Sequence, residues 1–236
     1  MIAVDPTLQA AAREDYEVGN LNGQVVVVVG GTGGLGQPIT EALRRRNSTV
    51  ITASRSLGAD VKLDLRDSTA GDELVAYVKS RHHRLDGVVI AAGIVAFGDL
   101  VDTDDVTIEE LLLTNTMGPL WLAKRVAPML EESNGFFVNL SGVVAETPMP
   151  AMAAYSASKA AVSAATLALA KEWRRKKIRV IDARPPHTET GLATRPLHGT
   201  APGMPEGLAP EVVAARIVDA IVNAERELSG ADFGNG

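Results

Sequence analysis

A run of five valines, Val25–Val29, leads directly into a turn that holds five glycines between residues 30 and 36. A continuously apolar run of this kind is typical of a strand covered on both faces of a parallel sheet. A helical pattern starts near Gly34, so strand, glycine-rich turn and helix follow one another. Such a turn lets the backbone approach a phosphate group, whose charge the helix amino end favours. The pattern predicts a nucleotide-binding α/β fold, the alternative being a tight turn that only packs helix on strand.

Short β-branched runs alternate with longer helical patterns along the rest of the chain. This alternation predicts parallel strands joined by crossover helices. Strands are expected at residues 24–29, 49–53, 60–63, 87–91, 136–140 and 178–183, and helices starting near residues 34, 71, 104, 151 and 209. The expected fold is α/β: a single Rossmann-like, doubly wound domain with a mostly parallel central sheet flanked by helices.

The chain of 236 residues is expected to divide into an amino-terminal extension, residues 1–20, and one catalytic domain, residues 21–236. The Pro- and Gly-rich stretch at about residues 185–210 is expected to be a substrate loop, of which residues 191–208 would close over the substrate. The alternative is a surface excursion without function.

Composition excludes several classes of function. A net charge of −6 argues against nucleic acid as a partner, because binding the phosphate backbone depends on cations. The chain has no cysteine, which rules out disulfides and thiolate metal sites, and no spaced His and carboxylate cluster suggests another metal site. No apolar stretch long enough for a membrane and no secretory signal is visible, so we expect a cytoplasmic protein without a membrane partner.

Ser54 and Arg55 follow the second expected strand, where an acidic residue would hold the ribose hydroxyls of NAD. Arg55 can instead form a charge-assisted contact with the 2′-phosphate of NADP. We therefore expect NADP as the cofactor, with NAD possible. The alternative is a solvated arginine on the surface.

Tyr155 and Lys159 are four residues apart in an Ala-rich helical pattern, so their side chains share one face. A free phenol has a pKa near 10, and a nearby ammonium is expected to lower that pKa. The pair would then supply a general acid for a carbonyl oxygen as hydride arrives. Without the nucleotide turn, a Tyr and Lys at this spacing would be read as structural.

These motifs together resemble the short-chain dehydrogenase/reductase family, from residue 21 to about residue 222. The family's TGxxxGxG turn is similar to residues 29–36, with Val29 in place of Thr, and its YxxxK pair matches Tyr155 and Lys159. Its helix Asn, which anchors a water in the proton relay, matches Asn115. The resemblance implies that Lys159 also holds the nicotinamide ribose.

Other positions match family residues that contact the cofactor. Asp64 matches an Asp that contacts adenine, and Thr190 matches the last residue of the family's PGxxxT. The family's NNAG keeps its glycine at Gly93 but lacks the first Asn side chains. The residues expected to bind the cofactor are Gly30, Thr32, Gly33, Gly34, Leu35, Gly36, Ser54, Arg55, Asp64, Leu65, Ala91, Ala92, Gly93, Tyr155, Lys159, Pro185, Thr188 and Thr190.

Two departures from the family pattern affect the expected mechanism. The catalytic Ser, usually thirteen residues before the Tyr, is replaced by Gly142. Ser141 could serve only if a bulge or turn redirected its side chain, and Thr147 is a second substitute. Loss of this donor would remove about 2.7–4 kcal/mol of transition-state stabilisation. The second departure is Pro186, which replaces the Gly of PGxxxT and fixes the backbone φ at this position. The following His187 could touch the substrate, the alternative being a loop histidine whose hydrogen bonds are made within the protein.

The resemblance implies an oxidoreductase that transfers a hydride between NADP(H) and a small carbonyl or alcohol substrate. Tyr155 would be the general acid in reduction and the base in oxidation, with Lys159, Asn115 and Ser141 completing the catalytic set. One alternative is a nucleotide-binding or regulatory protein with little turnover, since Gly142 replaces the Ser. An epimerase or dehydratase is disfavoured, because related enzymes usually carry an added substrate domain.

Two further expectations concern the ends of the fold. Family members usually assemble through two long helices, here about residues 104–131 and 151–175, so a homodimer or homotetramer is expected by resemblance. Residues 229–236 are the candidate for the last strand of the sheet.

Overall fold

A computed structural model of the chain describes residues 20–234, so almost all of the expected amino-terminal extension lies outside the described residues. Its centre is a seven-stranded parallel sheet with the order β3-β2-β1-β4-β5-β6-β7. The order reverses between β1 and β4, which confirms the doubly wound α/β fold. The strands are β1 (Val25–Val29), β2 (Thr49–Ser54), β3 (Val61–Lys62), β4 (Gly87–Ile90), β5 (Phe136–Leu140), β6 (Arg179–Ala183) and β7 (Glu227–Leu228).

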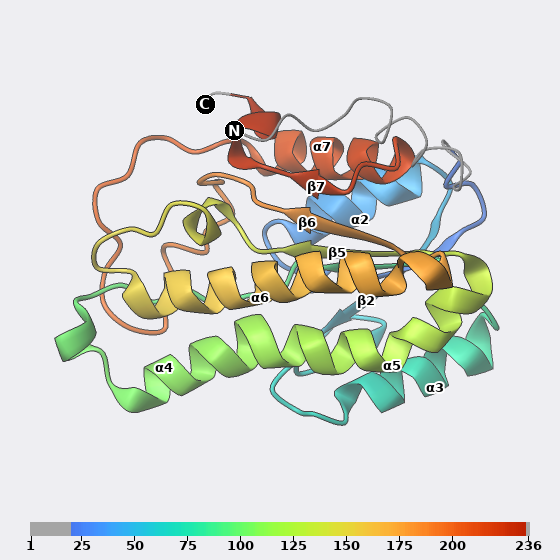
Figure 1. Cartoon of the computed structure of the whole chain (residues 1–236), viewed down its shortest axis with the longest axis horizontal. Helices are drawn as coiled ribbons and strands as arrows, with labels where there is room; N and C mark the ends of the chain where they lie inside the picture. The colour runs from blue at the N-terminus through green and yellow to red at the C-terminus, as the bar shows by residue number, and fades with distance from the viewer. Residues whose placement is uncertain (1–19, 235–236) are drawn as a thin grey trace.

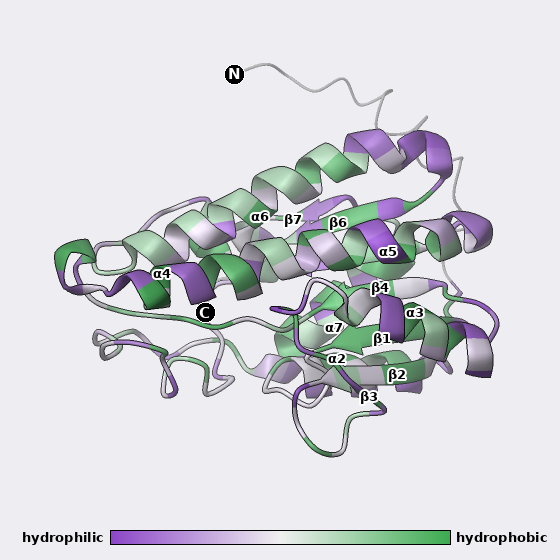
Figure 2. Ribbon diagram, turned by 90° about the horizontal axis from the view of Figure 1, so that it is seen from below, coloured by the Kyte–Doolittle hydropathy of each residue, from purple (hydrophilic) through white to green (hydrophobic). Residues whose placement is uncertain are grey.

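Helices cover both faces of the sheet (Figure 1). One face carries α2 (Gly36–Arg45) and α7 (Pro210–Val222), and the other carries α3 (Ala70–Arg81), α4 (Asp105–Leu112), α5 (Gly118–Ser133) and α6 (Ala153–Glu172). The valines of β1 alternate between the two hydrophobic cores that result, since Val27 packs in one and Val28 in the other. Figure 2 shows β1 and β4 as hydrophobic, with hydrophilic segments on the outer helices. Burial on both faces explains why this strand is an unbroken apolar run.

The helix expected over residues 104–131 is continuous but not uniform. A π-helical turn, Leu113–Met117, joins α4 to α5, and Asn115 lies within it. Single π turns inside α-helices frequently mark functional sites. Within residues 20–234, no helix has both the length and the apolar character needed to cross a membrane.

The expected last strand was wrong in its position. The final strand, β7, ends at Leu228, and the segment that follows is a 3₁₀ helix, Gly230–Phe233. Asp232 accepts hydrogen bonds from the backbone N–H and the hydroxyl of Ser229. This capping arrangement turns the chain into a helix at the place where the strand was expected.

The loop between β6 and α7 lies at the end of the molecule where α6 begins (Figure 1). Its two ends are joined to each other, since Thr188 and Leu208 form a parallel bridge, and the Leu208 N–H donates to the His187 carbonyl at 2.9 Å. The segment 191–206 therefore emerges from a hydrogen-bonded base. This base holds the loop next to the carboxyl ends of the strands, where open α/β sheets bind ligands.

Candidate functional site

A cavity of about 540 Å³ brings together motifs that are far apart in the sequence. This volume is within the range of small-molecule and cofactor sites. Of the residues expected at the cofactor, all except Gly36 line the cavity; they are Gly30, Thr32, Gly33, Gly34, Leu35, Ser54, Arg55, Asp64, Leu65, Ala91, Ala92, Gly93, Tyr155, Lys159, Pro185, Thr188 and Thr190.

The glycine turn is packed so tightly that side chains would not fit. A Cβ atom on Gly36 would lie 2.0 Å from the Gly30 carbonyl oxygen, and one on Gly34 would lie 2.1 Å from the Thr190 carbonyl oxygen. No side chain caps the amino end of α2. The Gln37 N–H donates to the Gly33 carbonyl at 2.9 Å and Pro38 has no N–H, so Leu35 and Gly36 are the residues of this helix start whose N–H groups can meet an anion, such as a phosphate of a dinucleotide.

Arg55 lies in the cavity wall beyond β2. Its side chain is exposed, and among the described residues it forms no ion pair. The neighbouring Ser54 hydroxyl shares a 2.9 Å hydrogen bond with Thr32, which connects β2 to the glycine turn. Asp64 is held by Arg66, with 2.6 Å between Oδ2 and Nη2, and this hydrogen bond keeps the pKa of Asp64 below its usual value. The wall thus offers a free guanidinium beside a paired carboxylate.

Tyr155 and Lys159 extend from the first turns of α6 into the cavity. The Lys159 ammonium donates to the Leu140 carbonyl oxygen at 2.8 Å and lies 6.0 Å from the centre of the Tyr155 ring. A Cβ atom on Gly93 would lie 3.4 Å from Lys159 Nζ. A glycine at this position therefore keeps the space beside the ammonium open.

The pKa of Tyr155 departs from the expectation. Burial raises it to about 12, whereas the sequence predicted a pKa lowered by Lys159. Burial also lowers the pKa of Lys159 to about 8, although the negative charge of Asp182 opposes this shift. An ammonium 6.0 Å from the ring does not offset the cost of burying a phenolate. At neutral pH the phenol is therefore protonated, and it holds the proton that a reduction requires.

Asn115 lies behind the cavity rather than in its wall. Its side-chain amide donates to the Ile94 carbonyl and to the Ser158 hydroxyl, and its carbonyl accepts from the Ile94 N–H at 2.9 Å. These contacts hold the segment after β4 against α6. Asn115 thereby sets the distance between Gly93 and the Tyr–Lys pair.

The bulge that Ser141 would need is present. The N–H groups of Ser141 and Gly142 both donate to the Ala183 carbonyl oxygen, at 3.0 and 3.4 Å. However, the Ser141 hydroxyl is fully buried and donates to Asp182 Oδ1 at 2.6 Å, so it is committed away from a substrate. Thr147 is exposed and lies outside the cavity wall. Gly142 has φ of 90°, a conformation that strains any other residue.

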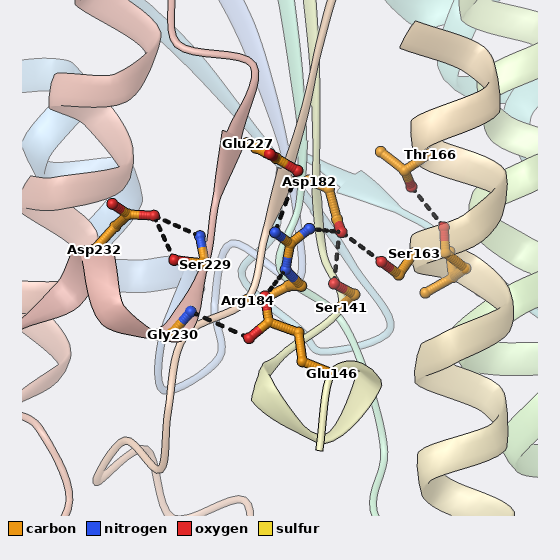
Figure 3. A network of polar contacts seen from close by, with 11 residues as sticks. Ser141, Glu146, Ser163, Thr166, Asp182, Arg184, Glu227, Ser229, Gly230 and Asp232 are labelled. Carbon is orange, nitrogen blue, oxygen red and sulfur yellow. Dashed lines mark hydrogen bonds and ion pairs between the residues drawn. The ribbon is translucent and has the colours of Figure 1, made fainter. Parts of the chain in front are cut away.

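Asp182 is the centre of a buried polar network that sequence reasoning missed (Figure 3). It accepts from Ser141, from Ser163 at 2.6 Å and from Arg184 Nη1 at 2.8 Å. Arg184 also pairs with Glu146, in the loop after Gly142, and with Glu227 of β7. Asp182 within a mostly apolar strand, with Arg184 directly after that strand, was the signal that could have revealed this network.

The end of the cavity beyond Tyr155 is mostly apolar, and sequence reasoning did not identify its residues. His187 also borders the cavity, and its Nε2 lies 3.1 Å from Glu189. Among residues 20–234, no group of three or more His, Asp or Glu side chains could hold a metal ion. The apolar wall is formed by Val95, Phe97, Val144, Met149, Met152, Leu192, Ala193 and Met204.

Curated proteins are similar to this chain in sequence. The chain is 30% identical over 182 residues to a short chain dehydrogenase of Pseudocercospora fijiensis, covering 69% of this chain and 59% of the relative. It is 27% identical over 209 residues to the bifunctional ribulose 5-phosphate reductase/CDP-ribitol pyrophosphorylase of Haemophilus influenzae, covering 88% of this chain and 42% of the relative. The chain thus spans about half the length of these two proteins.

Solved structures have the same architecture. A short-chain dehydrogenase from Streptomyces avermitilis has 25% identity and a TM-score of 0.80, with 90% of this chain and 91% of that chain covered. A 3-ketoacyl-(acyl-carrier-protein) reductase from Brucella melitensis complexed with NADH has 20% identity and a TM-score of 0.78, with 91% of this chain and 100% of that chain covered. At this identity the likeness shows the fold alone. The profile of the family described as short chain dehydrogenase matches residues 24–198, and the chain therefore belongs to the short-chain dehydrogenase/reductase family.

Proposed function

We propose that this chain is an NADP(H)-dependent oxidoreductase that interconverts a small carbonyl compound and its alcohol. One observation carries the proposal: the glycine turn, Arg55, Tyr155 and Lys159 line a single cavity at the carboxyl ends of the strands. Membership in a family that uses NAD(H) or NADP(H) supports it. Assembly into a homodimer or homotetramer stays a prediction from the family resemblance.

Each part of the cavity matches one part of the cofactor. The glycine turn and the uncapped amino end of α2 would hold the pyrophosphate, Ser54 and Arg55 the 2′-phosphate, and Asp64 and Leu65 the adenine. Lys159 would hold the nicotinamide ribose. When bound, the nicotinamide supplies or accepts the hydride.

Tyr155 would transfer the proton. In reduction the protonated phenol donates to the carbonyl oxygen, and in oxidation the phenolate accepts the proton of the alcohol. The ammonium of Lys159, fixed by the Leu140 carbonyl, stabilises negative charge on the phenol oxygen. Since the Ser141 hydroxyl is bonded to Asp182, Tyr155 carries the hydrogen bond to the substrate without that hydroxyl.

The substrate is expected to have an apolar body, because the cavity beyond Tyr155 is lined by aliphatic, thioether and phenyl side chains. A panel of aliphatic and aryl ketones tests this expectation, with consumption of NADPH followed by absorbance. Turnover should rise with the apolar area of the ketone. Equal or better turnover of small polar ketones would count against the apolar subsite.

Replacing Arg55 with Ala should weaken NADPH about 10- to 100-fold and leave NADH nearly unchanged. The reason is that a charge-assisted hydrogen bond contributes about 1.5–3 kcal/mol and only NADPH carries the 2′-phosphate. Dissociation constants from fluorescence titration measure the effect. Arg174→Ala removes an exposed cation outside the cavity and serves as the control. Matched losses for NADPH and NADH would show that Arg55 does not recognise the phosphate.

NADPH affinity should fall as pH rises through about 8, the pKa to which burial lowers Lys159. Below that pH the ammonium carries the charge that attracts the cofactor, and above it the amine is neutral. Tyr155, with a pKa near 12, keeps its proton throughout this range and cannot cause the change. Titrations from pH 7 to 9.5 should show the loss in the wild type and a flat, weak profile in Lys159→Met. An equal pH dependence in both proteins would assign it to another group.

A further inference from the structure

Arg195 is a cation of the cavity that the proposed function does not use. It belongs to the loop segment 191–206 and lines the cavity, although its side chain is exposed. Among the described residues it forms no ion pair. Its Nε donates to the Gly191 carbonyl oxygen at 3.1 Å, and its Nη2 would lie 3.8 Å from a Cβ atom on Gly191. The guanidinium is thus folded back onto Gly191.

Gly191 is next to the point where the loop contacts the glycine turn. The carbonyl oxygen of Thr190 lies 2.1 Å from the position of a Cβ atom on Gly34, so the two backbones are in direct contact. The Thr190 hydroxyl accepts from the Leu192 N–H at 3.3 Å, which fixes the chain direction after this contact. Arg195 is bonded to Gly191, the residue after this contact, and it lines the same cavity as the glycine turn.

The proposed function assigns no cationic side chain of the cavity to the pyrophosphate. The cavity's arginine and lysine side chains within residues 20–234 are Arg55, Lys159 and Arg195. Arg55 is beyond β2, and Lys159 is beside Tyr155. The glycine turn itself, residues 30–36, has no charged side chain, and the first turn of α2 has none either. Without Arg195, a pyrophosphate on this turn would meet backbone N–H groups and hydroxyls such as that of Thr32, but no cationic side chain from the turn.

We propose that Arg195 pairs with the pyrophosphate of the bound dinucleotide, so that the cofactor itself holds the loop segment 191–206 over the cavity. This inference rests on the proposed function. An arginine suits the role because its planar fork can bind two phosphate oxygens at once. The Gly191 carbonyl occupies Nε and leaves the two terminal nitrogens for the phosphates.

Binding of two ligands distinguishes recognition of the pyrophosphate from recognition of the 2′-phosphate. NADPH carries both groups, whereas adenosine 2′-monophosphate lacks the pyrophosphate. Arg195→Gln should weaken NADPH about tenfold or more and leave adenosine 2′-monophosphate within about twofold, as loss of one charged hydrogen bond requires. Arg55→Gln should weaken both ligands. Calorimetric titration of the full chain measures the dissociation constant of each ligand for the wild type and both variants, with Arg174→Gln as the control.

A second measurement follows the loop itself. Thermolysin, which cleaves before leucine, should cut the free protein at Leu197, an exposed residue of the loop. NADPH should protect this site in the wild type but not in Arg195→Gln at equal saturation, and adenosine 2′-monophosphate should protect neither protein. Arg195→Lys, which keeps the charge but not the planar fork, should restore part of the protection.

The inference is overturned if Arg195→Gln binds NADPH as tightly as the wild type, or if it loses both ligands equally. It is also overturned if the variant keeps its NADPH affinity but shows a raised KM for carboxylate-bearing ketones alone, because Arg195 would then bind substrate. In each of these cases the wild type still binds NADPH, so the proposed function stands. A wild type that binds no nicotinamide cofactor would refute the proposed function as well.

Discussion

Tyr155→Phe should lower kcat about 10²- to 10⁴-fold, the usual contribution of a positioned general acid. The substitution removes only the hydroxyl oxygen and keeps the ring in place on α6. At neutral pH the phenol carries its proton, because burial raises its pKa to about 12. The variant therefore loses the donor for the substrate oxygen. Its dissociation constant for NADPH should stay within about threefold of the wild type, since Lys159 and the glycine turn are unchanged.

Tyr77→Phe is the matched control, because Tyr77 is on α3 and does not line the cavity. It should leave kcat and NADPH affinity unchanged. Single-turnover measurements separate the chemical step from product release, which could otherwise mask the loss. A Tyr155→Phe protein that retains most of its single-turnover rate would remove Tyr155 from the mechanism.

Asp182→Ala should lower the free energy of unfolding by about 3–5 kcal/mol, the usual cost of removing one partner of a buried ion pair. The Asp182 side chain is completely buried, and its carboxylate accepts from Ser141, Ser163 and Arg184. Without it, two buried hydroxyls lose their acceptor, and Arg184 loses its most buried partner. Urea denaturation followed by circular dichroism measures the change.

Glu227→Gln tests the same network at its other end. The Glu227 side chain is 58% exposed and lies 3.3 Å from Arg184, so its loss should cost less than about 1 kcal/mol. Ser163→Ala removes one hydrogen bond to the buried carboxylate and should cost about 1.5–3 kcal/mol. If all three variants lost equally little free energy of unfolding, the network around Asp182 would not stabilise the fold.

Local chemistry accounts for the parts of the fold that could be predicted. The valine run of β1 predicts a strand buried on both faces, and its residues do alternate between the two cores. The six strands expected before residue 184 are present within one or two residues, because β-branched runs and glycine turns depend on nearby residues. The helices, for the same reason, start within two residues of their expected positions.

The features of the site that could not be predicted depend on contacts between residues far apart in the sequence. The bulge at Ser141 and Gly142 could be anticipated, but the destination of the Ser141 hydroxyl depends on Asp182, 41 residues away. The pKa of Tyr155 depends on burial, which no spacing along a helix reveals. Arg195 is far from the glycine turn in sequence, and the two line one cavity because Thr190 of the loop packs on Gly34. Residues such as these could not be assigned before the fold was known.

Hydride transfer itself can be followed with NADPH in which both hydrogens at C4 of the nicotinamide are replaced by deuterium. The protein is incubated with the labelled cofactor and an apolar ketone that it consumes, and the alcohol is analysed by mass spectrometry. We expect one deuterium at the carbinol carbon for each NADPH oxidised, and about a hundredth or less of the labelled alcohol when Tyr155→Phe replaces the wild type over the same time. A protein that binds NADPH but forms no deuterated alcohol from any ketone of the panel would contradict the account.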